Sequence, residues 1–167
     1  MKLTQLFLDE LGREADRTRR AVERVPVGRD DWKPHPRSMP FGRLAGLVAS
    51  MPSWLTLIID QDELDLTPPG GGQYQQPSTD KLVETLDKHV AKARESLSAT
   101  NDDFLLTTNW RLKAGGRVVA NDPRHIVIRD TLNHLAHHRG QLTVYLRMLE
   151  QPVPAIYGPS ADDQRFA

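Results

Sequence analysis

Residues 122–150 constrain the fold more than any other segment, because their apolar residues recur every three or four positions. These residues are Ile128, Leu132, Leu135, Leu142, Leu146 and Leu149. An α-helix has 3.6 residues per turn, so they lie along one side, the side that packs into a core. Asn121 or Asp122 suits the capping position, Pro123 suits the first helical position, and Pro152 follows the end. We therefore predict one long helix here.

Three other segments show the same periodicity. Apolar residues at helical spacing predict helices over roughly 3–25, from after Ser38 to about Ile59, and over 78–99. Pro52 lies inside the second helix, where it lacks the N–H for one backbone hydrogen bond, so we expect a kink there. Between the second and third helices, the Pro-, Gly- and Gln-rich segment 66–77 predicts a mobile loop.

The segment 105–120 departs from the helical pattern. A turn with Gly115 and Gly116 is flanked by apolar residues, namely Trp110 and Leu112 before it and Val118 and Val119 after it. This arrangement predicts a short β-hairpin. The expected fold is an all-α four-helix bundle of one domain, residues 1–167, with this hairpin between the third and fourth helices. We expect the proline-rich tail after Val153 to lie across the surface.

Composition excludes several classes of protein. Lys plus Arg and Asp plus Glu number 22 each, and the longest basic run is Arg19-Arg20, so we expect no nucleic-acid partner. The chain has no cysteine and therefore no disulfide, thiolate ligand or cysteine nucleophile. The N-terminus has no apolar signal core, and the apolar stretch 44–59 is too short to span a bilayer. We therefore predict a cytoplasmic protein with no membrane partner.

A polar stripe runs beside the apolar stripe of the last helix. It comprises His134, His138, Gln141 and Tyr145, spaced four, three and four residues apart. Two histidines four residues apart on a helix can present nitrogen to one metal ion, although metal sites usually need a third protein ligand. The pair therefore predicts either a metal site or hydrogen-bonded histidines that line a groove.

Arg139 falls near the apolar side of the same helix, where an unpaired charge is costly. It must therefore pair with a carboxylate, lie at a subunit interface, or extend its charged end to the surface. Gly140 beside it permits close approach of another backbone. If the interface is the explanation, the protein is a homodimer built partly on this helix.

Several segments resemble DinB-like proteins, and the resemblance covers nearly the whole chain. They are residues 132–147, residues 153–163, the segment from Trp32 to Met39, and Leu44-Ala45. The resemblance implies a four-helix bundle, usually a homodimer, with a divalent metal such as Zn or Ni held by three histidines. Two of these would be His134 and His138. Relatives with assigned activity are thiol-dependent S-transferases or isomerases that use low-molecular-weight thiols.

This chain departs from the family at one ligand position. The third histidine of the family lies in a pattern like Leu-Ala-x-His-Val-Ala, which here reads as residues 44–49, with Leu47 in place of histidine. Leucine cannot bind metal, so the site is expected to be weakened. His35 or an acidic residue can take its place, or Arg43 can put a cation near the histidines and repel metal.

Two functions remain open. One is a metal-dependent thiol transferase or related small-molecule enzyme, in which Gln141 and Tyr145 orient the bound molecule by hydrogen bonds. The other is a non-catalytic, metal-poor member that binds a small ligand in a cleft made more apolar by Leu47, or only dimerises. No nucleophile triad, phosphate loop or paired-carboxylate motif is visible. The remaining histidines are expected to be structural or incidental: His35, His89, His125 and His137.

Overall fold

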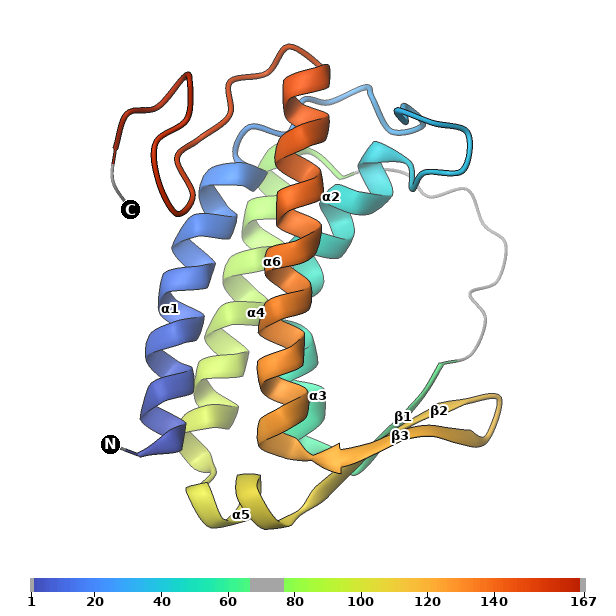
Figure 1. Ribbon diagram of the computed structural model, residues 1–167, viewed down its shortest axis with the longest axis vertical. Coiled ribbons are helices and arrows are strands. Elements are labelled where there is room, and N and C mark those ends of the chain that lie inside the picture. Colours follow the sequence, from blue (N-terminus) through green and yellow to red (C-terminus); the bar gives the residue numbers. More distant parts are fainter. Residues whose placement is uncertain (1, 67–76, 166–167) are drawn as a thin grey trace.

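The computed structural model describes residues 2–66 and 77–165, and within these it is mostly helical (Figure 1). The helices are α1 (Leu3–Val22), α2 (Phe41–Ser50), α3 (Ser53–Asp60), α4 (Thr79–Ala99), α5 (Asp102–Thr107) and α6 (Arg124–Met148). The long helices α1, α4 and α6 run along the length of the molecule, and α2 and α3 follow one another beside them. The described part of the chain thus has six helices rather than the four expected. Most of the predicted loop at 66–77 lies outside the described residues.

The predicted kink at Pro52 divides the second helix into two. The axes of α2 and α3 differ by 48° across this proline, as its missing N–H requires. The segment is therefore helical where expected, but it forms two helices instead of one kinked helix. Within residues 2–66 and 77–165, no single helix is long and apolar enough to cross a membrane; the bent α2–α3 pair passes that test by length and composition only when taken together.

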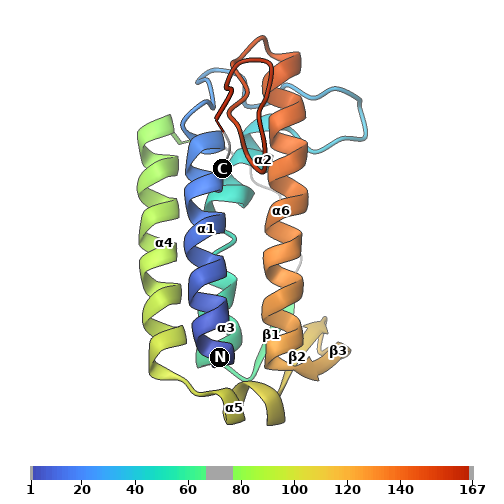
Figure 2. The same ribbon diagram turned by 60° about the vertical axis from the view of Figure 1, so that its left-hand side comes forward.

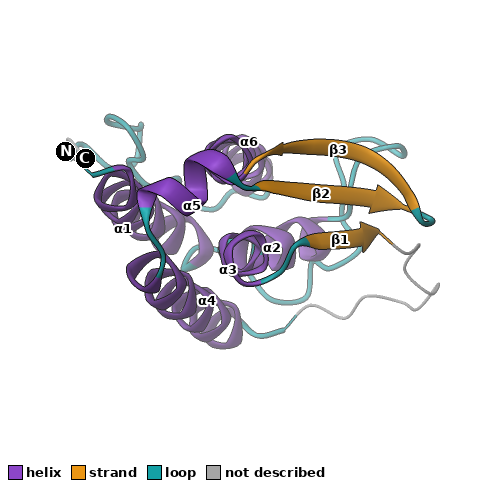
Figure 3. Ribbon diagram, turned by 90° about the horizontal axis from the view of Figure 1, so that it is seen from below, coloured by secondary structure: helices purple, strands orange, loops and turns teal. Residues whose placement is uncertain are grey.

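A small sheet lies at one end of the molecule, which corrects the expectation of an all-α chain with a hairpin. Its strands are β1 (Glu63–Leu66), β2 (Asn109–Ala114) and β3 (Arg117–Pro123), in the order β1-β2-β3. The predicted hairpin is the antiparallel β2–β3 pair, and its turn has positive φ at both Gly115 and Gly116, as a primed turn requires. Strand β1 pairs in parallel with β2 and was not predicted. Figure 3 shows β1 following α3 and β3 continuing into α6.

Helix α6 begins later than predicted. Asn121, Asp122 and Pro123 belong to β3, where they pair with residues 109–111 of β2. Pro123 therefore takes the capping position, and the first helical residue is Arg124. The capping role expected for Asn121 or Asp122 is wrong because strand pairing holds these residues extended. By contrast, α4 begins where predicted, and Ser78 caps it with a hydroxyl that accepts from the Lys81 N–H at 3.4 Å.

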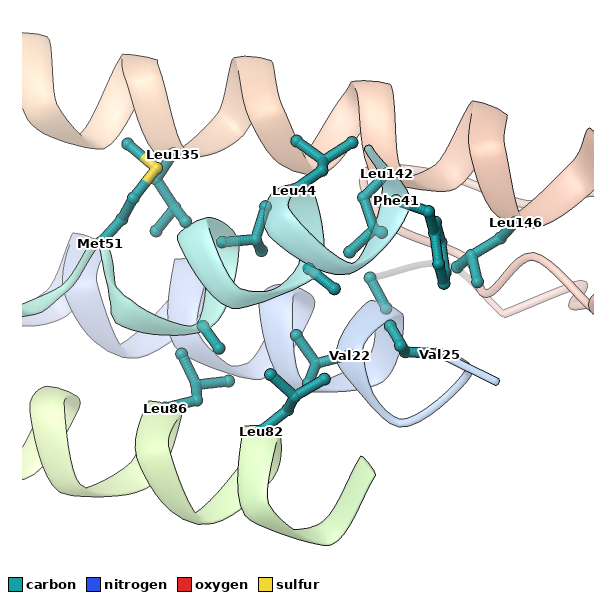
Figure 4. Packing of buried hydrophobic residues seen from close by; sticks show 14 residues of the cluster. Val22, Val25, Phe41, Leu44, Met51, Leu82, Leu86, Leu135, Leu142 and Leu146 are labelled. Atoms are coloured by element: carbon teal, nitrogen blue, oxygen red, sulfur yellow. The ribbon is translucent and has the colours of Figure 1, made fainter. Parts of the chain in front are cut away.

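The short helix α2 packs its apolar side against α6 (Figure 4). Leu44 lies beside Leu142, and Met51 lies beside Leu135, so the two helices run in opposite directions. Leu47 is in the turn of α2 between those contacts, and His138 is in the corresponding turn of α6. Leu47, where the resemblance implies a histidine, thus lies level with His138 along the two helices.

The C-terminal tail is fastened to the helices rather than only covering them. Figure 2 shows it in front of the upper ends of α1 and α6. Ala155 is fully buried, and the Tyr157 hydroxyl donates to Glu14 at 3.0 Å. The prediction of a surface tail was therefore incomplete, because Ala155 enters the protein and Tyr157, although 60% exposed, bonds to α1 through its hydroxyl.

Arg139 pairs with a carboxylate of its own chain. Its guanidinium lies 2.7 Å from Glu14, and the two side chains are 1% and 3% exposed. It also donates to Thr18 at 3.1 Å and to the Tyr157 hydroxyl at 2.6 Å. The interface and surface alternatives for Arg139 are therefore wrong, and it no longer supports a homodimer.

Candidate functional site

Three histidine rings gather on the outer side of α6. The ring centroids of His134 and His138 are 4.6 Å apart, and that of His137 is 5.1 Å from His138. Gln141 joins two of them, with its Oε1 2.8 Å from Nδ1 of His138 and its Nε2 3.1 Å from Nε2 of His137. The helical spacing thus brings His134, His138 and Gln141 together as expected, and His137 joins them.

The orientation of the Gln141 amide sets the tautomers of two rings. A carbonyl oxygen only accepts, so in the orientation found here Nδ1 of His138 carries the hydrogen, while the amide NH2 donates to Nε2 of His137. The second nitrogen of His138, Nε2, then keeps its lone pair. A neighbour that fixes one ring nitrogen in this way leaves the other ready to take a proton or bind a metal.

His134 lies beside an aromatic side chain of the neighbouring helix α3. Its ring lies 5.5 Å from that of Trp54 on α3. Burial lowers the pKa of His134 below its ordinary value of 6.5, and the neighbouring His138 and His137 lower it further. The His134 imidazole is therefore neutral at pH 7 and can accept or donate a hydrogen bond.

The described residues do not complete a three-ligand metal site. Within residues 2–66 and 77–165, no three His, Asp or Glu side chains gather in an arrangement that holds a metal. Leu47 is half-buried against the core, and Nδ1 of His35 accepts from the Arg37 N–H at 3.2 Å in its own loop. His134 and His138 thus supply two ligands, and metal binding stays a prediction.

Tyr145, the last member of the predicted stripe, lies apart from the histidines. It is two helical turns beyond His138, which is about 10 Å along the axis. Its hydroxyl donates to the Met39 carbonyl at 3.3 Å, and its ring meets Trp32 edge-on at 5.5 Å between centroids. Tyr145 therefore holds the loop before α2 against α6.

A cavity of about 400 Å³ lies between α3, the sheet and α6, with His134 in its wall. Apolar side chains make most of this wall, including Trp54, Leu57, Leu64, Trp110, Leu112 and Val127. The polar part comprises Asp122, Asp130, Thr131 and His134. No segment of the sequence predicted this cavity, because its wall combines three elements, one of them the unpredicted β1.

Strand alternation explains why the cavity is apolar. Successive side chains of a strand point to opposite sides, so Trp110 and Leu112 face the cavity while Arg111 and Lys113 face away. Both cations pair with Glu63 of β1 on that far side. The alternation of charged and apolar residues in β2 was visible in the sequence, although its consequence depended on what the strand packs against.

Arg124 fastens the end of α3 to the start of α6 and so supports the cavity. It is 2% exposed, and its guanidinium donates to the Gln61 carbonyl at 2.6 Å and to Asp62 at 2.7 Å. It also donates to the carbonyl of Ile58, a cavity residue. These bonds satisfy carbonyls at the C-terminus of α3 that the helix leaves unpaired.

The chain is similar over most of its length to proteins of one family. The sequence profile of the DinB family matches residues 1–165. The uncharacterized protein YrdA of Bacillus subtilis (strain 168) is 29% identical over 99 residues, or 54% of this chain and 56% of that protein. The match therefore spans about half the length of YrdA.

Solved structures share the fold. A DinB-like protein from Bacillus cereus ATCC 10987 superposes with a TM-score of 0.67 at 23% identity, over 90% of this chain and 95% of that one. The DinB-like protein YjoA from Bacillus subtilis superposes with a TM-score of 0.63 at 16% identity, over 87% and 92% of the two chains. At these identities the likeness concerns the fold alone.

Proposed function

The chain belongs to the DinB family, and on that premise we propose that it binds a small, mostly apolar organic molecule in the cavity between α3, the sheet and α6. The scaffold would be the four-helix bundle that the family resemblance implies. The binding role corresponds to the metal-poor alternative, although Leu47, which was expected to make its cleft more apolar, does not line this cavity.

The cavity itself carries this proposal. Its volume of about 400 Å³ falls in the range of small-molecule pockets, which is about 300–1,000 Å³. Such pockets are lined mostly by apolar and aromatic side chains with a few polar groups that orient the ligand. Trp54, Trp110 and Leu112 supply the first kind of wall, and Thr131 and His134 supply the second.

The neutral His134 ring is suited to hold the polar part of a bound molecule. It can accept a hydrogen bond through one nitrogen and donate through the other. His138 and Gln141 lie directly behind it on the same helix face. The ligand would thus have its apolar body against the sheet and a polar group toward α6.

Filling the cavity tests the proposal. We expect the neutral fluorescent probe N-phenyl-1-naphthylamine to bind saturably, and Ala120→Leu, which adds volume on the cavity side of β3, to weaken binding about tenfold. The matched control is Val119→Leu, because Val119 does not line the cavity and is 55% exposed. Absence of saturable binding, or equal binding by the two variants, would contradict the proposal, with circular dichroism verifying that each variant is folded.

A second candidate function keeps the metal. In it, His134 and His138 bind a divalent cation, Zn or Ni, in a metal-dependent thiol S-transferase or related enzyme, as the family resemblance implies. The supporting observation is the 4.6 Å separation of the two rings, together with the free Nε2 of His138. The use of a thiol and the binding of a metal are both proposals, since the described residues supply only two metal ligands, His134 and His138.

Calorimetric titration of the untagged protein with zinc chloride tests this candidate. Leu47→His should raise zinc affinity about tenfold or more by supplying a third ligand in the turn that faces His138. His138→Ala should abolish the gain. If zinc affinity is the same in Leu47→His and the unchanged protein, Leu47 does not face the pair; if the unchanged protein binds no zinc, the metal candidate fails.

A homodimer also stays a prediction. The outward side of α6 carries Gly140 and two exposed apolar residues, Val144 at 57% and Met148 at 51%. If this stripe is the interface, Val144→Glu should lower the mass measured by sedimentation from that of two chains to that of one. A single-chain mass for the unchanged protein would end the homodimer proposal and, with it, the purely dimeric role.

A further inference from the structure

We infer that the molecule held in this cavity is a cationic amphiphile, with an apolar body and a protonated amine. The inference rests on the proposed function, because it assumes that the cavity is a ligand site. It adds the charge of the ligand, which the apolar wall alone does not determine.

The charged residues of the wall are all acidic. Asp122 comes from the end of β3 and Asp130 from the second turn of α6, and no Lys or Arg lines the cavity in the described part of the chain. The cations of β2, Arg111 and Lys113, lie on the far side of the sheet with Glu63. A cavity walled by one sign of charge and low-dielectric side chains favours ligands of the opposite sign.

The two carboxylates differ in how free they are. Asp130 lies 3.2 Å from Arg129, and both side chains are 61% exposed. An exposed pair between neighbouring residues is weak, so a ligand amine can compete with Arg129 for the carboxylate. Asp122 is exposed, and no ion pair of its carboxylate is found among the described residues. Asp122 is therefore the stronger candidate for the amine contact.

The aromatic part of the wall favours the same class of ligand. Two indole rings, Trp54 and Trp110, line the cavity, and an indole face attracts a cation within about 6 Å.

Three probes of the same shape and different charge test the inference. They are 4-phenylbutylamine, 4-phenylbutan-1-ol and 4-phenylbutanoate, measured by displacement of N-phenyl-1-naphthylamine at low salt. We expect the amine to bind about tenfold tighter than the alcohol and the carboxylate to bind weakest. Added salt should narrow the amine–alcohol difference, because ions screen exposed charges.

Variants locate the effect. Asp122→Asn should reduce amine affinity roughly fivefold and leave the alcohol unchanged, and Asp122→Asn with Asp130→Asn should remove the preference. Asp16→Asn is the matched control, since it makes the same change of charge on the exposed side of α1, away from the cavity wall. If the double variant does not fold, the amine affinities of the two single Asp→Asn variants are compared with that of the unchanged protein.

The outcomes separate the inference from the proposed function. If the alcohol or the carboxylate binds as tightly as the amine, the cationic class is overturned while the cavity remains a ligand site. If the amine is preferred equally by Asp122→Asn, Asp130→Asn and the unchanged protein, the acidic wall is not the cause and the inference is overturned. If neither these probes nor the fluorescent probe binds, the proposed function itself fails.

Discussion

The polar side chains on the two sides of α6 differ in their hydrogen-bond partners. On the inner side, Arg139 is bonded to Glu14, Thr18 and Tyr157, all of the same chain. On the outer side, the described bonds of His138 reach no further than Gln141, one turn along the same helix. Buried polar groups must be paired within the protein, whereas exposed ones can keep free positions for a ligand. The inner side therefore serves stability, and the outer side is where binding should be sought.

The inner network joins Arg139, Tyr157 and Glu14, and one of its donors, Nε of Arg139, has no acceptor among the described residues. Arg139 donates to the Tyr157 oxygen at 2.6 Å, and the Tyr157 hydroxyl donates to Glu14 at 3.0 Å. Glu14 also accepts from Arg17 at 2.6 Å. Burial alone would raise the pKa of the Glu14 carboxyl, but the Arg139 charge and the hydrogen bonds from Arg17, Arg139 and Tyr157 hold it below its ordinary value of 4.5.

The largest effect is expected from Arg139→Met. This change leaves the buried Glu14 carboxylate without its main counter-charge, and breaking such a pair costs about 3–5 kcal/mol of the free energy of unfolding. Urea denaturation at pH 7 measures it. The matched control is Arg129→Met on the same helix, where the side chain is 61% exposed and the cost should stay within about 0.5 kcal/mol.

Removing both members of the pair sharpens this prediction. A Glu14→Leu and Arg139→Met double variant should recover part of the loss, because no unpaired charge is then buried. If Arg139→Met costs no more than Arg129→Met, the inner side of α6 does not differ from its exposed side.

Glu14→Gln should have the next largest effect, and it should depend on pH. Loss of a charged hydrogen-bond partner costs about 1.5–3 kcal/mol at pH 7. The folded pKa of Glu14 lies below its unfolded value, so the carboxylate stabilises the protein above the unfolded value and loses this contribution as pH falls through the folded one. The stability difference between the two proteins should therefore shrink as pH is lowered from 5 toward 3. A difference that stays constant or grows on acidification would show that ionised Glu14 is not stabilising.

Tyr157→Phe should have a smaller effect. It removes the hydroxyl that joins Arg139 to Glu14 while leaving their ion pair, at a cost of about 1–2 kcal/mol. Tyr145→Phe is the comparison, because its hydroxyl makes one long bond of 3.3 Å to the Met39 carbonyl. Thermal unfolding of the two variants measures the difference, and an equal loss would mean that the tail contributes no more than the loop before α2.

Helical periodicity recovered the positions of the long helices and the neighbours on α6, since both depend on residues a few positions apart. It did not recover β1, because residues 63–66 pair with β2, which is remote in the sequence. It did not recover the start of α6 either, because pairing of residues 121–123 with β2 overrides their capping signal. The partner of Arg139 is 125 residues away on α1, so the sequence left three alternatives. The cavity was not predictable for the same reason.

The smallest effect on stability is expected from His138→Ala. His138 is half-buried and its bond to Gln141 stays within one turn of a helix that other contacts hold in place, so the free energy of unfolding should change by no more than about 0.5 kcal/mol. The same variant should lose zinc binding if the metal candidate is correct. A stability loss like that of Arg139→Met would show that His138 also stabilises the fold. The two sides of α6 would then differ in position but not in role.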